Sequence, residues 1–146
     1  MKILVMGLPG SGKTTLAKLL APMFNAVYLN GKDVRRDVDD WDFSKAGRLK
    51  QAERMRFLAI TEGEEKNRVV VADFVCPTNF TRLEFNADYT IYMDTIKESQ
   101  FEDTNKIFEQ PKKIDFQVKH KDAAMFSFSI KQDILDKHGN LGPHSK

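Results

Sequence analysis

The stretch of sequence that decides the fold spans residues 7–14 and reads GLPGSGKT. It matches the pattern G-x-x-x-x-G-K-[ST] at every fixed position. The apolar run 3–6 stands directly before it and predicts a buried strand, while the apolar side chains of residues 14–23 recur at helical spacing. Because strand, glycine-rich loop and helix follow one another in this order, we interpret residues 7–14 as a phosphate-binding loop rather than a simple glycine turn.

The chemistry of such a loop explains its residue types. Glycines let backbone N–H groups converge on phosphate oxygens, and the start of the following helix adds a favourable dipole. The Lys13 ammonium can reach the β- and γ-phosphates, and the Thr14 hydroxyl can bind Mg²⁺. The sequence therefore predicts a site for ATP and Mg²⁺ formed by Gly7, Pro9, Gly10, Ser11, Gly12, Lys13, Thr14 and Thr15.

Length and composition limit the remaining possibilities. The chain has 146 residues, of which 41% are hydrophobic and 30% charged, and its formal net charge is +2. These values are typical of one folded domain and disfavour a nucleic-acid-coating protein. A single cysteine excludes an internal disulfide and fits a reducing compartment, and no apolar run approaches the roughly 20 residues that span a bilayer. We expect one cytoplasmic domain over residues 1–138 with no membrane partner, and a flexible tail over residues 139–146.

The rest of the chain alternates strand and helix patterns, which predicts an α/β fold with helices on both faces of a mostly parallel sheet. Ser44 is a candidate cap for a long helix running to about residue 66, and residues 97–109 are expected to form a helical or looped lid. Further helices are expected over residues 77–85 and 123–137. About five strands are expected: the run at residues 3–6 and four further strands over residues 26–29, 68–73, 89–93 and 115–118.

Two acids are candidates for the catalytic machinery. Asp73 ends the clearest strand, at the edge of the sheet where α/β proteins bind ligands, and it can hold Mg²⁺ or orient an acceptor hydroxyl. Asp33, near the end of the second strand, is the other candidate base. The chain lacks the N-K-x-D guanine-reading motif at a suitable position and is short for a motor or transporter ATPase. A small kinase is the remaining class, in which a second substrate lies beside the nucleotide.

Basic and aromatic residues supply candidates for the acceptor side. Arg35 follows a strand edge and Arg48 lies one turn into the long helix, where guanidinium groups can neutralise a polyanion. We expect Arg54 and Arg56 to lie on a solvated helix face. The aromatic rings of Trp41 and Phe43 can stack on a base or anchor their loop to the core.

Taken in order, these segments resemble the adenylylsulfate kinases, also called adenosine 5′-phosphosulfate (APS) kinases. The family pattern is a G-x-x-G-x-G-K-T loop, then D-G-D-N-V-R, G-F-S, D-R-x-E-N-I-R-R, I-S-P-Y-R and V-D-T. The corresponding segments of this chain are residues 7–14, NGKDVR at 30–35, DFS at 42–44, GRLKQAER at 47–54, FVCPT at 74–78 and MDT at 93–95.

The resemblance implies ATP-dependent phosphorylation of the 3′-hydroxyl of APS, a step of sulfate assimilation. It implies that Arg35 and Arg48 hold the phosphosulfate, that Phe43 stacks on the adenine, and that Gln51 replaces an acceptor-contacting asparagine. Pro77 and its neighbour Cys76 would line the acceptor pocket, and Cys76 otherwise has the character of a packing residue. The partner implied is a small nucleotide, and the oligomeric state stays open, with a homodimer as one candidate.

The chain also departs from the family pattern. Asn30 and Lys32 replace both acids of D-G-D-N, so we hypothesise that the metal-binding acid has moved to Asp73. The lid segment 101–108 lacks the family's arginine, and the F-T-G-I stretch is missing. Two alternatives therefore remain open: a kinase for another nucleotide, a nucleic-acid group or a small alcohol, and an ATP-binding module without transfer activity.

Overall fold

The structure, a computed structural model, describes residues 1–139. Its sheet has five strands in the order β2-β3-β1-β4-β5, and every neighbouring pair is parallel. The predicted α/β class is thus confirmed, with a sheet that is parallel throughout. The strands are β1 (Lys2–Met6), β2 (Val27–Asn30), β3 (Val70–Asp73), β4 (Tyr89–Met93) and β5 (Phe116–Val118).

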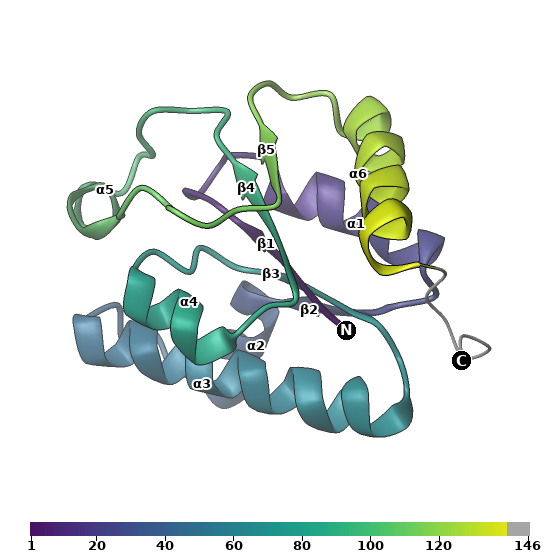
Figure 1. Ribbon diagram of the computed structural model, residues 1–146. Helices are drawn as coiled ribbons and strands as arrows, with labels where there is room; N and C mark the ends of the chain where they lie inside the picture. Colours follow the sequence, from purple (N-terminus) through teal and green to yellow (C-terminus); the bar gives the residue numbers. More distant parts are fainter. Residues whose placement is uncertain (140–146) are drawn as a thin grey trace.

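Helices cover both faces of the sheet and complete three layers (Figure 1). One face carries α1 (Lys13–Met23) and α6 (Ala123–His138), and the other carries α2 (Gly31–Val38), α3 (Lys45–Glu62) and α4 (Asn79–Phe85). The short helix α5 (Glu102–Ile107) stands apart from both layers, at one end of the molecule. Within residues 1–139, no helix is long and apolar enough to cross a bilayer.

The side chains of β1 point alternately to the two faces of the sheet, so this one strand contributes to two hydrophobic clusters. Ile3 and Val5 point into the cluster beneath α1 and α6, whereas Leu4 and Met6 point into the cluster beneath α3 and α4. All four side chains are at most 1% exposed. A strand buried on both faces reads as a continuous apolar run, which is the pattern seen at residues 3–6.

The carboxyl ends of the central strands bring the candidate functional segments together. After β1 the chain runs through the phosphate loop and α1 into β2, which does not pair with β1. Strand β3 pairs with β1 instead, so β3 lies between β1 and β2. The register sets Val5 beside Asp73 and Asp73 beside Asn30. Asp73 therefore lies between the strand that feeds the phosphate loop and the strand that feeds α2, at the edge where such sheets bind ligands.

Some expected boundaries differ from the structure. The long helix α3 ends at Glu62 instead of about residue 66, because the backbone leaves the helical conformation at Gly63, with φ of −114° and ψ of −82°. A separate 3₁₀ turn covers Glu64–Lys66, and a side chain at Gly63 would collide with Val70. Helix α2 was not expected, because five of its eight residues are charged and Val34 and Val38 are its only large apolar side chains. The tail expected over residues 139–146 lies, from residue 140 on, outside the described residues.

Candidate active site

The phosphate loop adopts a conformation that only glycine allows at two of its positions. Gly12 precedes α1 with φ of 100°, in the left-handed region. At Gly7, an added Cβ would lie 2.9 Å from the Met93 carbonyl oxygen and 2.8 Å from the Ser11 hydroxyl. The glycines thus allow the loop to turn tightly against the end of β4 before α1 begins.

Two side chains from distant segments hold the outside of this loop. The Thr95 hydroxyl donates to the Ser11 carbonyl at 2.6 Å, and the Lys121 ammonium donates to the Gly10 carbonyl at 2.9 Å. Both carbonyls belong to the loop that the sequence predicts for phosphate binding. Lys121 was not a predicted site residue, because nothing in its sequence neighbourhood marks it as a partner of a loop 111 residues away.

Lys13 lies inside the loop, almost completely buried, and its ammonium donates to the Leu8 carbonyl at 3.0 Å. Burial lowers the pKa of Lys13, and the nearby charge of Asp73 opposes that shift. A buried ammonium with one carbonyl partner can exchange that partner for phosphate oxygens.

Asp73 is the centre of the polar contacts at the end of β3. Its side chain is 2% exposed, and its Oδ2 accepts hydrogen bonds from the Thr14 hydroxyl at 2.8 Å, the Tyr28 hydroxyl at 2.7 Å and the Asn30 amide at 3.0 Å. Burial and these contacts with Asp73 raise the pKa of Tyr28 to about 12, so the phenol stays protonated as a donor. Tyr28 was not a predicted site residue, because an aromatic residue in a strand is usually part of the core.

The donor set at this point is compatible with a magnesium ion. Mg²⁺ prefers oxygen ligands and commonly takes one or two from the protein and the remainder from water and phosphates. The Thr14 hydroxyl and the Asp73 carboxylate are two such oxygens in direct contact. Among the described residues there is no cluster of three or more His, Cys, Asp or Glu side chains suited to a metal, so a protein-only metal cage is not formed there.

A single cavity of about 430 Å³ joins the two predicted halves of the site. Lys13, Thr14 and Asp73 line one part of it, together with Pro9 and Gly10 of the phosphate loop. The remainder is lined by the predicted acceptor residues and by three aromatic rings that are 45–48% exposed. These acceptor residues are Arg35, Phe43, Arg48, Gln51, Cys76 and Pro77, and the aromatic rings are those of Trp41, Phe43 and Phe101.

Arg35 and Arg48 both lie close to the Phe43 ring. Their guanidinium carbons are 4.4 Å and 5.3 Å from the ring centroid, and both side chains are 6% exposed. Arg35 donates to the carbonyls of Asp40 and Asp42, and Arg48 donates to the Phe43 carbonyl. Burial lowers the pKa of both arginines, yet a guanidinium stays charged at neutral pH. The cavity thus presents two cations that are held mostly by neutral carbonyls.

Helix α5 reaches the acceptor part of the cavity through Thr104. The Thr104 hydroxyl is buried and accepts a hydrogen bond from Arg48 at 2.9 Å, and the carboxylate of Asp103 lies 3.6 Å from the same guanidinium. The expected lid segment therefore contains a helix that contacts an acceptor-side arginine directly. Thr104 was not a predicted site residue, because a threonine in a polar segment carries no distinctive signal.

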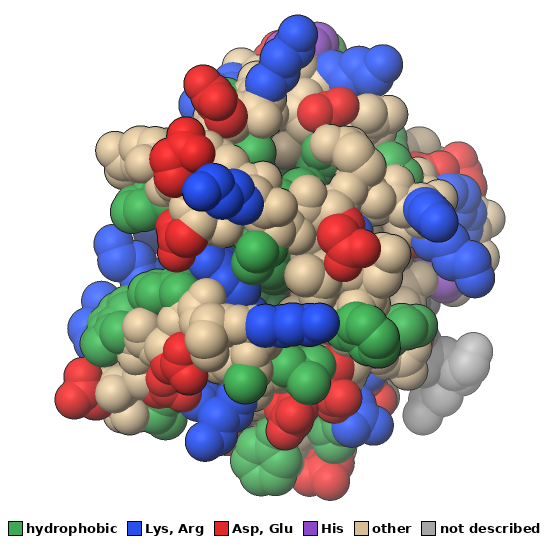
Figure 2. Space-filling view, turned by 90° about the vertical axis from the view of Figure 1, so that its left-hand side faces the viewer, with side chains coloured by type: hydrophobic (Ala, Val, Ile, Leu, Met, Phe, Trp, Pro, Cys, Tyr) green, Lys and Arg blue, Asp and Glu red, His purple; other side chains and the backbone are tan. Residues whose placement is uncertain are grey.

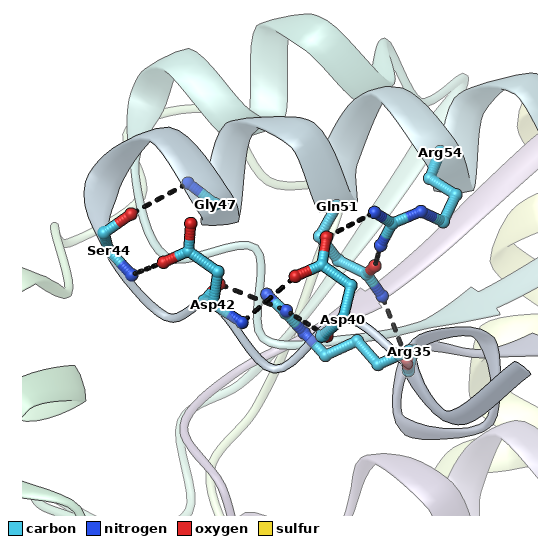
Figure 3. Close-up of polar contacts among 8 residues, drawn as sticks. Arg35, Asp40, Asp42, Ser44, Gly47, Gln51 and Arg54 are labelled. Atoms are coloured by element: carbon cyan, nitrogen blue, oxygen red, sulfur yellow. Dashed lines mark hydrogen bonds and ion pairs between the residues drawn. The ribbon is translucent and has the colours of Figure 1, made fainter. Parts of the chain in front are cut away.

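Gln51 lines the cavity, but both ends of its amide already have partners. Its nitrogen donates to the Gly31 carbonyl at 2.9 Å, and its oxygen accepts from Arg54 (Figure 3). Arg54 also donates to Asp40 at 2.6 Å, and its side chain is 17% exposed. The expectation that Arg54 lies on a solvated helix face is therefore wrong, because its fork has two partners close to the cavity. Arg56, with a side chain 47% exposed, does lie on such a face.

Cys76 and Pro77 follow β3 and close the cavity on the α4 side. Cys76 is 1% exposed and has a left-handed φ of 47°, and Arg82 donates to the carbonyls of both residues. Burial raises the pKa of the Cys76 thiol to about 12, so it is protonated at neutral pH. This environment fits the packing character expected for Cys76.

Several predicted site residues do not line the cavity. Asp33 lies in the first turn of α2, and its exposed carboxylate pairs with Arg36 at 2.5 Å. Ser11 is fully buried, its N–H closes a turn to Leu8, and its hydroxyl has no partner among residues 1–139. The structure thus brings Asp73, and not Asp33, into the lining of the cavity. The other predicted residues outside the lining are Gly7, Gly12 and Thr15.

Fold and site together define a protein with the architecture of the P-loop kinases: a phosphate loop between β1 and α1, and a second binding region beside it. Residues 3–102 match the family described as AAA domain, and the chain belongs to that family. No curated protein matches the sequence.

Solved structures share this fold at low sequence identity. The APS kinase of Mycobacterium tuberculosis in complex with AMPPNP and APS has a TM-score of 0.74 and 17% identity, covering 91% of this chain and 96% of that chain. Shikimate kinase from Aquifex aeolicus has a TM-score of 0.65 and 22% identity, over 94% and 98% of the two chains. The hexameric APS kinase of Thiobacillus denitrificans has a TM-score of 0.73 and 23% identity, over 97% of this chain and 30% of that chain.

Proposed function

We propose that the protein is an ATP-dependent kinase that phosphorylates the 3′-hydroxyl of adenosine 5′-phosphosulfate. The observation that carries the proposal is the single cavity, in which Lys13, Thr14 and Asp73 adjoin Arg35, Arg48 and Phe43. A phosphoryl donor and an anionic acceptor with a planar ring each find suitable groups there.

In the reaction, the acceptor 3′-oxygen attacks the γ-phosphorus of ATP, the bond from that phosphorus to the β,γ-bridging oxygen breaks, and the hydroxyl proton leaves. Lys13 stabilises charge on the transferring group, because its ammonium already lies within the phosphate loop. Asp73 orients the acceptor hydroxyl or accepts its proton. Thr14 and Asp73 would hold Mg²⁺, which when bound neutralises charge on the phosphates.

The acceptor end of the cavity supports an anionic nucleotide. Arg35 and Arg48 supply two buried positive charges for the phosphosulfate, and the Phe43 ring close to them is 45% exposed and can stack on the adenine. Trp41 and Phe101 add two further rings at the same end. A nonaromatic acceptor such as shikimate or gluconate would leave these rings without a stacking partner.

The surface supports a small-molecule acceptor over a nucleic acid. Figure 2 shows the face that carries α5, where Lys and Arg side chains alternate with Asp and Glu and with hydrophobic side chains. A nucleic-acid-binding face is usually a continuous basic surface. This face therefore favours a free nucleotide as the acceptor, and a cytoplasmic location is a further part of the proposal.

The test is release of ADP from Mg²⁺-ATP by purified protein, with and without APS, with the phosphorylated product identified by mass. APS-dependent ADP release with that product is the expected result, and Lys13→Ala should abolish it. ADP release only with another acceptor would show that this acceptor, and not APS, is the substrate. ATP binding without any acceptor-dependent release would favour a module without transfer activity.

A further inference from the structure

Arg54 is an arginine beside the cavity that the proposed chemistry does not use, and its side chain joins two segments of the chain. Its two terminal nitrogens donate to different partners: one to the Gln51 amide oxygen, the other to the Asp40 carboxylate at 2.6 Å (Figure 3). Gln51 lies one turn back on α3, while Asp40 belongs to the connection between α2 and α3. Arg54 thus joins α3 to that connection.

The connection, residues 39–44, carries the Trp41 and Phe43 rings and is held mainly by polar contacts. Asp40 accepts from the Asp42 N–H, Asp42 accepts from the Ser44 N–H, and Ser44 caps α3 at Gly47 (Figure 3). The 39–44 loop also approaches α3 so closely that a side chain at Gly47 would collide with Asp42. Trp41 and Phe43 are half exposed, so apolar burial contributes little to holding the loop.

Charge gives Arg54 a second effect on the acceptor end. Asp40 presents its backbone carbonyl to Arg35, while its carboxylate is paired with Arg54. The Arg54 hydrogen bond also lowers the pKa of Asp40. Without Arg54, an ionised Asp40 would be left near Arg35, where it would compete with an anionic acceptor for the guanidinium.

We propose that Arg54 is a positioning residue for the acceptor: it fixes the 39–44 loop through Asp40 and pairs with the Asp40 carboxylate, so that this carboxylate does not pair with Arg35. The inference deepens the proposed function, on which it rests for the identity of the acceptor. Arg54 itself does not line the cavity, so its effect passes through Asp40, Gln51 and the rings of the loop.

The first test needs no acceptor. Trp41 is the only tryptophan of the chain, so acrylamide quenching of its fluorescence reports the 39–44 loop alone. Arg54→Ala should raise the quenching constant by about twofold as the loop loosens. Asp40→Asn, which turns an amide nitrogen toward Arg54, should also raise the quenching constant. Arg56→Ala is the matched control, because Arg56 lies on the same helix with one long ion pair to Glu84 at 3.8 Å.

The second test separates positioning from a general structural role. Arg54→Ala should raise the KM for APS about tenfold or more and leave the KM for ATP within about twofold, because only the acceptor end of the cavity is disturbed. The Arg54→Ala and Asp40→Asn effects should not add in the double variant, since both remove the same contact.

Either test can overturn the inference. Quenching in Arg54→Ala equal to that in Arg56→Ala would overturn it, even if the protein proved inactive on APS, so a failed proposed function and a failed inference give different results. In an active enzyme, equal changes in the two KM values, or additive effects of Arg54→Ala and Asp40→Asn, would also overturn it.

Discussion

The hydroxyl of Thr14, at the start of α1, donates a 2.8 Å hydrogen bond to Oδ2 of Asp73, at the end of β3. This contact joins the phosphate loop to the strand beside β1 across 59 residues of sequence. It places a hydroxyl and a carboxylate, two oxygen types that suit Mg²⁺, in the part of the cavity that is lined by the phosphate loop.

The first prediction concerns the choice between two acids. Asp73→Asn should lower kcat by about 10²-fold or more, because it removes the carboxylate beside the phosphate loop. The kcat of Asp33→Asn should stay within about twofold of the wild-type value, since Asp33 pairs with Arg36 outside the cavity. Steady-state kinetics measure both. Binding of Mn²⁺ with ATP, followed by electron paramagnetic resonance, should weaken in Asp73→Asn, and unchanged binding and turnover there would contradict the role of Asp73.

The second prediction concerns Tyr28 and pH. Its raised pKa of about 12 means that, as pH rises from about 10 to 12, the unfolded chain loses the phenolic proton before the folded protein does. The stabilising contribution of Tyr28 is therefore complete below pH 10 and is lost through that window. Urea unfolding should show wild type more stable than Tyr28→Phe by about 1–2 kcal/mol at pH 8, and a smaller difference at pH 11. A difference that is constant or grows with pH would refute this account; the remaining tyrosines are common to both proteins.

The third prediction concerns the single cysteine. With a pKa of about 12 and 1% exposure, Cys76 should react with a thiol reagent at pH 8 only after unfolding, because about one thiol in 10⁴ is ionised at that pH. The reaction with 5,5′-dithiobis(2-nitrobenzoate) in native and denaturing buffer measures this. Rapid modification of the native protein would show that the segment after β3 opens readily.

The fourth prediction concerns Arg48. Arg48→Lys keeps the charge but loses the fork that donates to both Phe43 and Thr104, so the KM for APS should rise about tenfold while the KM for ATP changes little. Lys50→Ala, at an exposed position of the same helix, is the control. If the two variants behave alike, Arg48 serves the packing of α5 and not the acceptor.

How much of the structure can be predicted from the sequence depends on how far apart in the chain the interacting residues lie. The strand at residues 89–93 was predicted to the residue, and the class of fold follows from apolar runs and one glycine-rich loop, which are local signals. Helix α2 was missed because its stability depends on the Asn30 cap and on Val34 packing against the core, while its other residues are mostly charged.

The site residues likewise divide into those with a local sequence signal and those that depend on distant partners. The motif predicts Lys13 and Thr14, and the strand-end position predicts Asp73, so these three could be found from neighbours in sequence. Tyr28, Thr104 and Lys121 could not, because each acts through a partner 45 or more residues away. Arg54 was misjudged for a related reason: helical periodicity places it on a surface, and only the position of Asp40 shows that this surface is covered.

If one cavity binds both ATP and the acceptor, the protein should transfer label directly from [γ-³²P]ATP to APS. Wild-type protein should place the label on the 3′-oxygen of APS, and Arg48→Ala should transfer much less at the same APS concentration. Label recovered only in ATP and inorganic phosphate, with ATP bound by the protein, would contradict this prediction.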